Sequence, residues 1–252
     1  ALSGKYEREL DWEGKVVQSC VHCHQIGDGT RSAYRDQKKA IPREWIYPMP
    51  MPETVGLTLA PEHIAKVEAV QPGSIAARAG LQPGDEILSL DGQPLLSIAD
   101  FSWALHHAPK SGALPATVKR GGSTQKLPMT LPEDWRLKSD ISRRVGTWGM
   151  RAMALGGLQL EELAADARRE RGLKPDGMAL FVKHAGEYGN HAAAKKAGFA
   201  KGDVITRIGD LSAAMSEGEL IGRILENHQP GDKIKSQVLR GSERLELNLP
   251  VQ

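Results

Sequence analysis

An internal repeat constrains the fold of this chain more than any other feature of its sequence. The stretch AARAGLQPGDEILSLDG, Ala76 to Gly92, returns in divergent form as AKKAGFAKGDVITRIGD, Ala194 to Asp210. Each copy has the pattern of a short helical turn ended by glycine, a Gly-Asp turn and a short apolar strand. A unit that recurs at this spacing within 252 residues is a duplicated domain rather than one turn of a solenoid.

The parallel continues downstream of both copies. SIAD at 97–100 and SEGE at 216–219 have the pattern of helix N-caps with an acidic residue three positions later. Two alternating strands follow in each copy, ATVKRGGSTQKLPMTL and SQVLRGSERLELNL, which predicts hairpins that turn at Gly121-Gly122 and Gly241-Ser242. The expected fold class is therefore α+β, mainly β with helices.

The first copy resembles a known family of domains. AARAGLQPGDEILSLDGQPL is similar to the bacterial PDZ domains that accompany HtrA-type proteases, and the second copy is a more divergent version. The resemblance implies two small β-sandwich or partly open barrel domains, each capped by two helices. We expect a mostly helical or loop segment at 1–52, PDZ-like domains at 53–135 and 154–252, and a linker at 136–153. This linker is rich in Trp and Arg, so we expect it to pack on one or both domains.

The resemblance also implies a binding function. PDZ domains bind an extended peptide as an added strand beside a helix, while backbone N–H groups hold a C-terminal carboxylate. In TVGLTL the matching positions are Val55, Gly56, Leu57 and Thr58, and a glycine permits the close backbone approach that a carboxylate requires. The second copy has GGLQL at 156–160. The alternative is that these glycines only turn the chain.

We expect the first groove, rather than the second, to be the working peptide site. Trp103 lies off the apolar stripe at positions 98, 101 and 105 of the predicted groove helix, so it is a candidate to line the groove. The alternative is that Trp103 packs on the N-terminal segment or the linker. In the second copy, EELAADARRERGLKP predicts a helix inserted beside the groove, where it can cover or reshape the groove. Gly218 lies inside the second groove helix, where a glycine costs about 1 kcal/mol relative to alanine.

Both cysteines of the chain lie in SCVHCHQIGD. Cys20 precedes Cys23 by three residues, and His24 directly follows Cys23. Four interpretations compete. A disulfide at this spacing closes a very small loop and stabilises little. A thioredoxin-like dithiol needs a surrounding βαβ unit, which the flanking sequence does not show, and zinc needs four ligands, for which no second cysteine pair exists. Covalent haem c, with two thioethers and the His24 nitrogen on iron, explains the motif best.

The sixth ligand of such an iron is open. Met49 and Met51 lie between prolines in WIYPMPMPETV, an extended run that can present a thioether sulfur to the metal. The alternative is that both methionines pack against the first PDZ-like domain as linker residues. His63, His106 and His107 are other candidates, and a five-coordinate iron is a further possibility.

The whole chain resembles secreted bacterial proteins in which a Cys-x-x-Cys-His segment precedes tandem PDZ domains. Four stretches carry this resemblance: CVHCHQIGD, WIYPMPMPETVGLTL, SIADFSWALHHAP and LPEDWR. The chain is similar to thioredoxin-like/PDZ proteins, in some of which a thioredoxin-like domain precedes this region. It implies a periplasmic or otherwise exported c-type haem protein that binds partner peptides and acts in electron transfer or redox sensing. The alternatives are a peroxidase-like haem enzyme, a Cys-x-x-Cys thiol–disulfide enzyme, and a peptide-binding, chaperone-accessory scaffold without a redox role.

The distribution of charge, the lengths of apolar runs and the catalytic motifs narrow the functional classes open to the chain. The 33 basic and 31 acidic residues are well mixed, so no basic stripe points to nucleic acid. No apolar run approaches the ~18 residues of a membrane span, and the first ten residues lack the pattern of a signal peptide, as a mature exported chain would. Gly-x-Ser-x-Gly and His-Glu-x-x-His motifs are absent, so nothing indicates proteolysis and binding is favoured over catalysis.

Overall fold

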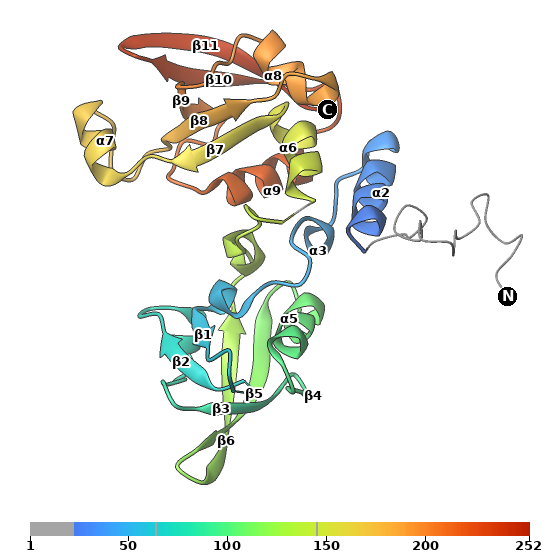
Figure 1. Cartoon of the computed structure of the whole chain (residues 1–252), viewed down its shortest axis with the longest axis vertical. Coiled ribbons are helices and arrows are strands. Elements are labelled where there is room, and N and C mark those ends of the chain that lie inside the picture. Colours follow the sequence, from blue (N-terminus) through green and yellow to red (C-terminus); the bar gives the residue numbers. More distant parts are fainter. Residues whose placement is uncertain (1–22, 64, 145) are drawn as a thin grey trace, which may run out of the picture.

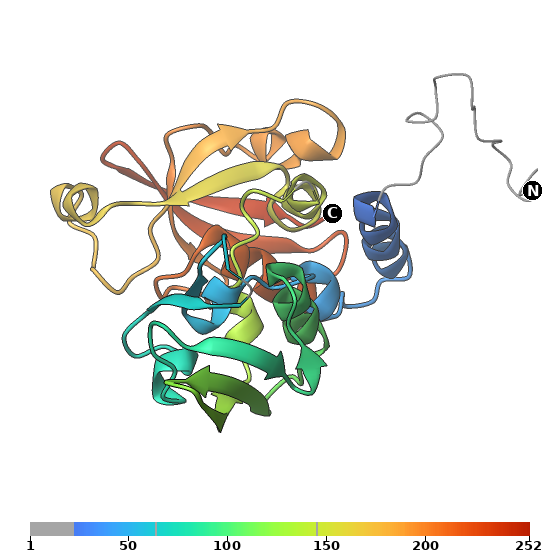
Figure 2. The same cartoon turned by 60° about the horizontal axis from the view of Figure 1, so that its bottom comes forward.

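The computed structural model describes residues 23–63, 65–144 and 146–252. Two domains lie one beyond the other along the longest axis, and α3 (Arg43–Ile46) lies between them (Figure 1). Helix α2 (Cys23–Asp36) stands to one side of the second domain in both views (Figures 1 and 2). The mixture of antiparallel sheets and helices confirms the predicted α+β class.

The first domain combines two antiparallel sheets with two helices. One sheet has the order β1-β2 and the other has the order β4-β3-β5-β6. Its elements in chain order are η1 (Pro52–Val55), β1 (Leu57–Leu59), β2 (Val67–Val70), α4 (Ile75–Arg78), β3 (Glu86–Leu90), β4 (Gln93–Pro94), α5 (Ile98–His107), β5 (Gly112–Arg120), β6 (Ser123–Leu131) and η2 (Trp135–Lys138).

The second domain repeats this plan around one five-stranded sheet of order β11-β10-β9-β8-β7. The second groove helix, α9, packs against both α6 and β7. The elements of the second domain in chain order are α6 (Thr147–Leu155), β7 (Leu158–Glu162), α7 (Ala165–Glu170), β8 (Leu180–Ala185), η3 (Gly189–Ala192), α8 (Ala193–Lys196), β9 (Val204–Ile208), α9 (Glu217–Asn227), β10 (Lys233–Arg240) and β11 (Glu243–Pro250).

The predicted turns and helix starts are confirmed, with one difference. Strand pairing ends at Arg120–Ser123 and at Arg240–Glu243, so both hairpins turn at the expected positions. α9 begins with a complete capping box between Ser216 and Glu219. At the start of α5 the Ser97 hydroxyl accepts from the Asp100 amide, but the shorter Asp100 side chain reaches the amide of Leu96 instead.

The aspartate of the repeated Gly-Asp turn holds each copy together. Asp85 accepts two hydrogen bonds from Arg120, at 2.6 and 2.8 Å, and Asp203 accepts two from Arg240, at 2.7 and 2.9 Å. Each aspartate also accepts from the backbone amide three residues before it. Because both carboxylates are 1% exposed or less, these bonds fix the last residue of one hairpin strand to the turn that begins another strand.

Segments outside the two repeats complete the core of the second domain. The buried cluster of that domain includes residues from the N-terminal segment and from the linker: Ile41, Ile46, Tyr47, Leu137 and Ile141. Trp135, just before the linker, belongs instead to the buried cluster of the first domain. Arg136 of the linker donates to the carbonyls of His106 and Ala108 in the first domain. The linker therefore packs on both domains, which is one of the two arrangements expected from its composition.

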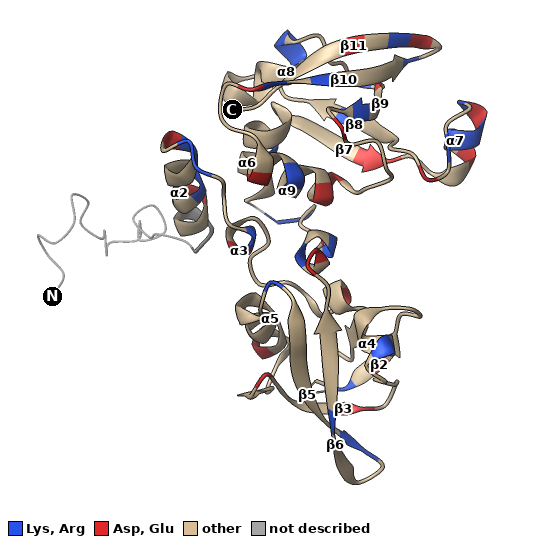
Figure 3. Ribbon diagram, turned by 180° about the vertical axis from the view of Figure 1, so that it is seen from behind, with Lys and Arg blue, Asp and Glu red and all other residues tan. Residues whose placement is uncertain are grey.

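Polar contacts join the same segments to both domains. Arg43 pairs with Glu226 of α9 and, at 2.9 Å, with Asp134 at the end of the first domain. Lys138 pairs with Glu219 at 2.5 Å. Elsewhere basic and acidic residues are interspersed along the ribbon of both domains (Figure 3). Within the described ranges, every helix is too short or too polar to cross a membrane.

Candidate peptide-binding grooves

Strand β1 presents backbone N–H groups to an edge that no other described strand occupies. Leu57 pairs with Val70 and Thr58 pairs with Ala69, and the Gln71 amide donates to the Gly56 carbonyl at 2.9 Å. In an antiparallel ladder this pattern turns the Thr58 N–H toward β2 and the N–H groups of Leu57 and Leu59 away from it. β1 can therefore accept one further strand.

Gly56 positions this edge. Its φ of +84° lies in the left-handed region, and a Cβ there would come within 2.1 Å of the Ser74 Cβ. The side chains of Val55 and Leu57 point into the core, each 1% exposed, and Thr58 is exposed. The Gly56 amide donates to carbonyls within η1, so the backbone of Leu57 and Leu59 is what this loop offers to a ligand.

The second domain has the same strand register but a different groove. Leu158 pairs with Ala185, and the Gly186 amide donates to the Gly157 carbonyl at 3.1 Å. In both copies the register then shifts between the second and third residues of the strand, at Thr58/Leu59 and at Gln159/Leu160. Leu160 therefore corresponds to Leu59. Its N–H is already used, because it donates to the Glu217 carboxylate at 2.7 Å.

Glu217 is held at this position by a buried arginine. Arg151 of α6 donates from Nε to one carboxylate oxygen at 2.9 Å and from Nη2 to the other at 2.6 Å. The Arg151 and Glu217 side chains are only 3% and 7% exposed. Glu217 is the first residue of α9, and the first residue of α5 is the partly buried Ile98. The helix beside the second groove thus begins with a carboxylate that accepts from the groove strand, whereas the corresponding helix of the first domain begins with an apolar residue.

The inserted segment of the second domain does not play the role expected of it. The predicted helix is reduced to α7, which projects beyond the end of β7 (Figure 1). Glu217 and Arg151, rather than this helix, occupy the groove. Gly218 and Gly222 also have a packing role, because they lie where Tyr47 and the linker cross α9.

Trp103 and the two candidate methionines lie on or beside α5. Trp103 is 50% exposed, and its ring contacts that of His107 with centroids 4.0 Å apart and the ring planes tilted by 46°. The Met51 sulfur accepts from the Ser102 hydroxyl at 3.6 Å, and the Met49 amide donates to Nδ1 of His106 at 3.4 Å. Burial and the positive charges of His107 and Arg136 lower the pKa of His106, which suits this acceptor role.

The Cys-x-x-Cys-His motif lies at the start of the described chain. Cys20 is outside the described residues, and Cys23 and His24 lie in α2. One turn later, Asp28 pairs with Arg31 at 2.5 Å, and Arg31 donates to the Trp45 carbonyl. Arg35 donates to the carbonyls of Gln252 and His228, which fixes α2 to the second domain. His63 lies in the loop between β1 and β2, away from this helix in sequence.

Comparison with known proteins agrees with the repeat and the fold. PDZ domain models match residues 66–120 and 189–251, so the chain contains two PDZ domains. It is similar to a "Probable periplasmic serine endoprotease DegP-like" of Pseudomonas savastanoi pv. phaseolicola, with 31% identity over 56% of this chain and 28% of that protein. It is also 40% identical to the "Regulator of sigma-E protease RseP" of Escherichia coli over 27% of this chain and 14% of that protein.

Among solved structures, the chain is similar to "HtrA-type protease AlgW with tripeptide". The two share 20% sequence identity over 75% of this chain and 57% of the other, with a TM-score of 0.35. The chain covers 28% of the length of the DegP-like protein and 14% of the length of RseP.

Proposed function

We propose that this chain binds an extended segment of another protein, ending in a free carboxylate, as an added strand on β1 of the first PDZ domain. The observation that carries the proposal is the contrast between two equivalent positions. The Leu160 amide donates to Glu217, the first residue of α9, whereas the first residue of α5 is Ile98, which has no carboxylate to offer the Leu59 amide. A peptide carbonyl placed beside β1 would accept from the N–H groups of Leu57 and Leu59.

The second PDZ domain, by the same reasoning, acts as a rigid support. Its groove is filled from within, and its α9 carries the linker and the N-terminal segment. A buried pair with two hydrogen bonds between its members and a third to the backbone does not open readily, because separating it leaves a charge in a dry site. We therefore assign peptide affinity to the first domain.

A matched pair of variants tests the assignment in the full chain. Ile98→Glu introduces a carboxylate where the second domain has Glu217, and the exposed neighbour Ala99→Glu adds the same charge one position away. We expect Ile98→Glu to weaken binding of a C-terminal peptide library at least tenfold and Ala99→Glu to change it less than about threefold, because exposed charges contribute little. Equal loss in both variants, or binding that survives Ile98→Glu, would contradict the assignment.

We further propose that Cys20, Cys23 and His24 attach haem c, as the sequence motif indicates. The helical conformation of Cys23 and His24 supports the proposal, since it places both residues on one helix, α2. The donor set fits, with two thiols for thioethers and an imidazole for the iron; bound haem would supply one-electron chemistry. Met49 and Met51 stay candidates for the second axial ligand, although Met51 already contacts α5.

The visible spectrum tests this second proposal. Protein matured in a host that attaches c-type haem should keep its colour through acid–acetone extraction, and a Cys20→Ala/Cys23→Ala variant should be colourless. If extraction leaves colourless wild-type protein, the chain is a peptide-binding scaffold without haem. We propose an exported location for either form, by similarity to relatives described as periplasmic.

A further inference from the structure

The second domain has an insertion that the first domain lacks. β1 and β2 are joined by residues 60–66, whereas β7 and β8 are joined by residues 163–179, which include α7. Arg168 fixes this segment, because its Nε donates to the Leu163 carbonyl at 2.9 Å and its Nη1 donates to the Gly177 carbonyl at 2.6 Å. Arg168 is 7% exposed, so the insertion is a fixed hook rather than a loose loop.

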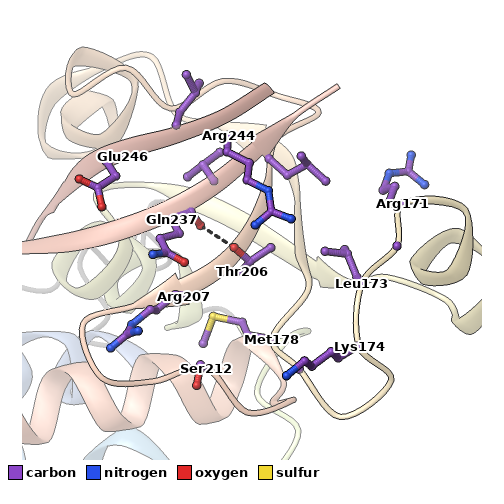
Figure 4. A pocket seen from close by; sticks show the side chains of 15 residues that line it. Arg171, Leu173, Lys174, Met178, Thr206, Arg207, Ser212, Gln237, Arg244 and Glu246 are labelled. Carbon is purple, nitrogen blue, oxygen red and sulfur yellow. Dashed lines mark hydrogen bonds between the residues drawn. The ribbon is translucent and has the colours of Figure 1, made fainter. Parts of the chain in front are cut away.

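The hook and the outer face of the sheet enclose a hollow of about 580 Å³ (Figure 4). Leu173 and Lys174 come from the hook, and Arg244 extends from β11 on the other side. The floor carries the hydroxyl of Thr206, which donates to the Gln237 carbonyl at 3.2 Å. This volume lies within the ~300–1,000 Å³ of organic ligand sites.

Positive charge dominates the lining. The basic residues outnumber the single carboxylate of Glu246; they are Arg171, Lys174, Arg207 and Arg244. Arg171 and Arg207 have acidic neighbours only at 3.9 and 3.8 Å. Within the described ranges Lys174 and Arg244 form no ion pair, so their charges are available to a ligand.

We propose that this hollow binds an acidic peptide segment carrying at least two carboxylates. Carboxylates would pair with Lys174 and Arg244, and peptide N–H groups would donate to Glu246 and to the Gln237 side chain. A lone inorganic anion fits less well, because it would fill little of the hollow and could not use the acceptors Glu246 and Gln237. The site is separate from the β1 edge, so the two can be tested independently.

Fluorescence anisotropy with a labelled, C-terminally amidated Asp/Glu-rich peptide tests the proposal in the full chain. The amidated end removes the carboxylate that the β1 groove would hold. We expect binding that weakens with salt, and about fivefold weaker binding in Lys174→Ala/Arg244→Ala, from two exposed pairs of ~0.5 kcal/mol each. The control Lys201→Ala/Lys233→Ala removes two exposed charges of the same domain outside the hollow and should bind as wild type.

Several results would overturn the proposal. They are equal weakening in both double variants, undiminished binding of the matched Asn/Gln peptide, and complete displacement of the acidic peptide by inorganic phosphate at equal concentration. Preference for a single-stranded oligonucleotide over the acidic peptide would also overturn it, since that would assign the hollow to nucleic acid.

Discussion

Removing the Glu217 carboxylate should destabilise the second domain strongly. Glu217→Ala leaves the Arg151 guanidinium without a counter-charge at a site where Arg151 is only 3% exposed. It also deprives the Leu160 N–H of its acceptor. Breaking a buried pair by removing one member costs ~3–5 kcal/mol, a large part of the ~5–15 kcal/mol that stabilises a typical domain. With a urea m-value of ~2 kcal/mol/M, the unfolding midpoint should fall by roughly 2 M.

A double-mutant cycle separates the pair from its surroundings. The cycle consists of Arg151→Leu, Glu217→Leu and the double variant. The double variant replaces both charges with apolar side chains, so it should be more stable than either of these single variants. Urea unfolding followed by tryptophan fluorescence is a suitable assay. The Trp148 ring lies 4.7 Å from the Arg151 guanidinium, so its emission reports on the surroundings of the pair. A loss below about 1 kcal/mol for Glu217→Ala, or additive effects in the double variant, would refute a buried, coupled pair.

Two further substitutions test how the fold is held together. Gly222→Ala should destabilise by ~1–3 kcal/mol in urea unfolding despite its better helix propensity, because the new Cβ would lie 2.1 Å from the Tyr47 hydroxyl oxygen; Gly218→Ala, whose nearest contact is 3.4 Å, is the control and should be neutral or stabilising. Equal effects would remove the steric argument. Asp85→Asn tests pH dependence: hydrogen bonds from Arg120 lower the pKa of Asp85, so its contribution is present above the ordinary aspartate pKa and is lost as pH falls through the lowered value. The variant should therefore show a smaller fall in stability over that acidic range, and an unchanged acid profile would contradict this role.

The local features of the fold could be read from the sequence. The repeat, the two hairpins and the N-caps at Ser97 and Ser216 follow from short-range periodicity and turn chemistry, and the structure confirms them. The packing of the Trp- and Arg-rich linker on both domains was also predictable, because such residues are rarely left in a free spacer.

Contacts between distant residues could not be read in the same way. Arg151 and Glu217 are 66 residues apart, and nothing near either residue indicates its partner. The sequence therefore suggested the inserted helix as the obstacle in the second groove, whereas the structure places the Glu217 carboxylate there. The pairing of Asp85 with Arg120 has a signal in hindsight, because the repeat has Arg240 at the matching end of the second hairpin.

Amide hydrogen exchange of the full chain, with and without a saturating C-terminal peptide, tests the central claim most directly. If the peptide adds to β1 as a strand, its carbonyls accept from Leu57 and Leu59, and these two amides should become protected. The Leu160 amide, already bound to Glu217, should be protected in both states and unchanged by the peptide. Protection gained at β7 instead of β1, or binding with no protection at Leu57 and Leu59, would contradict the account.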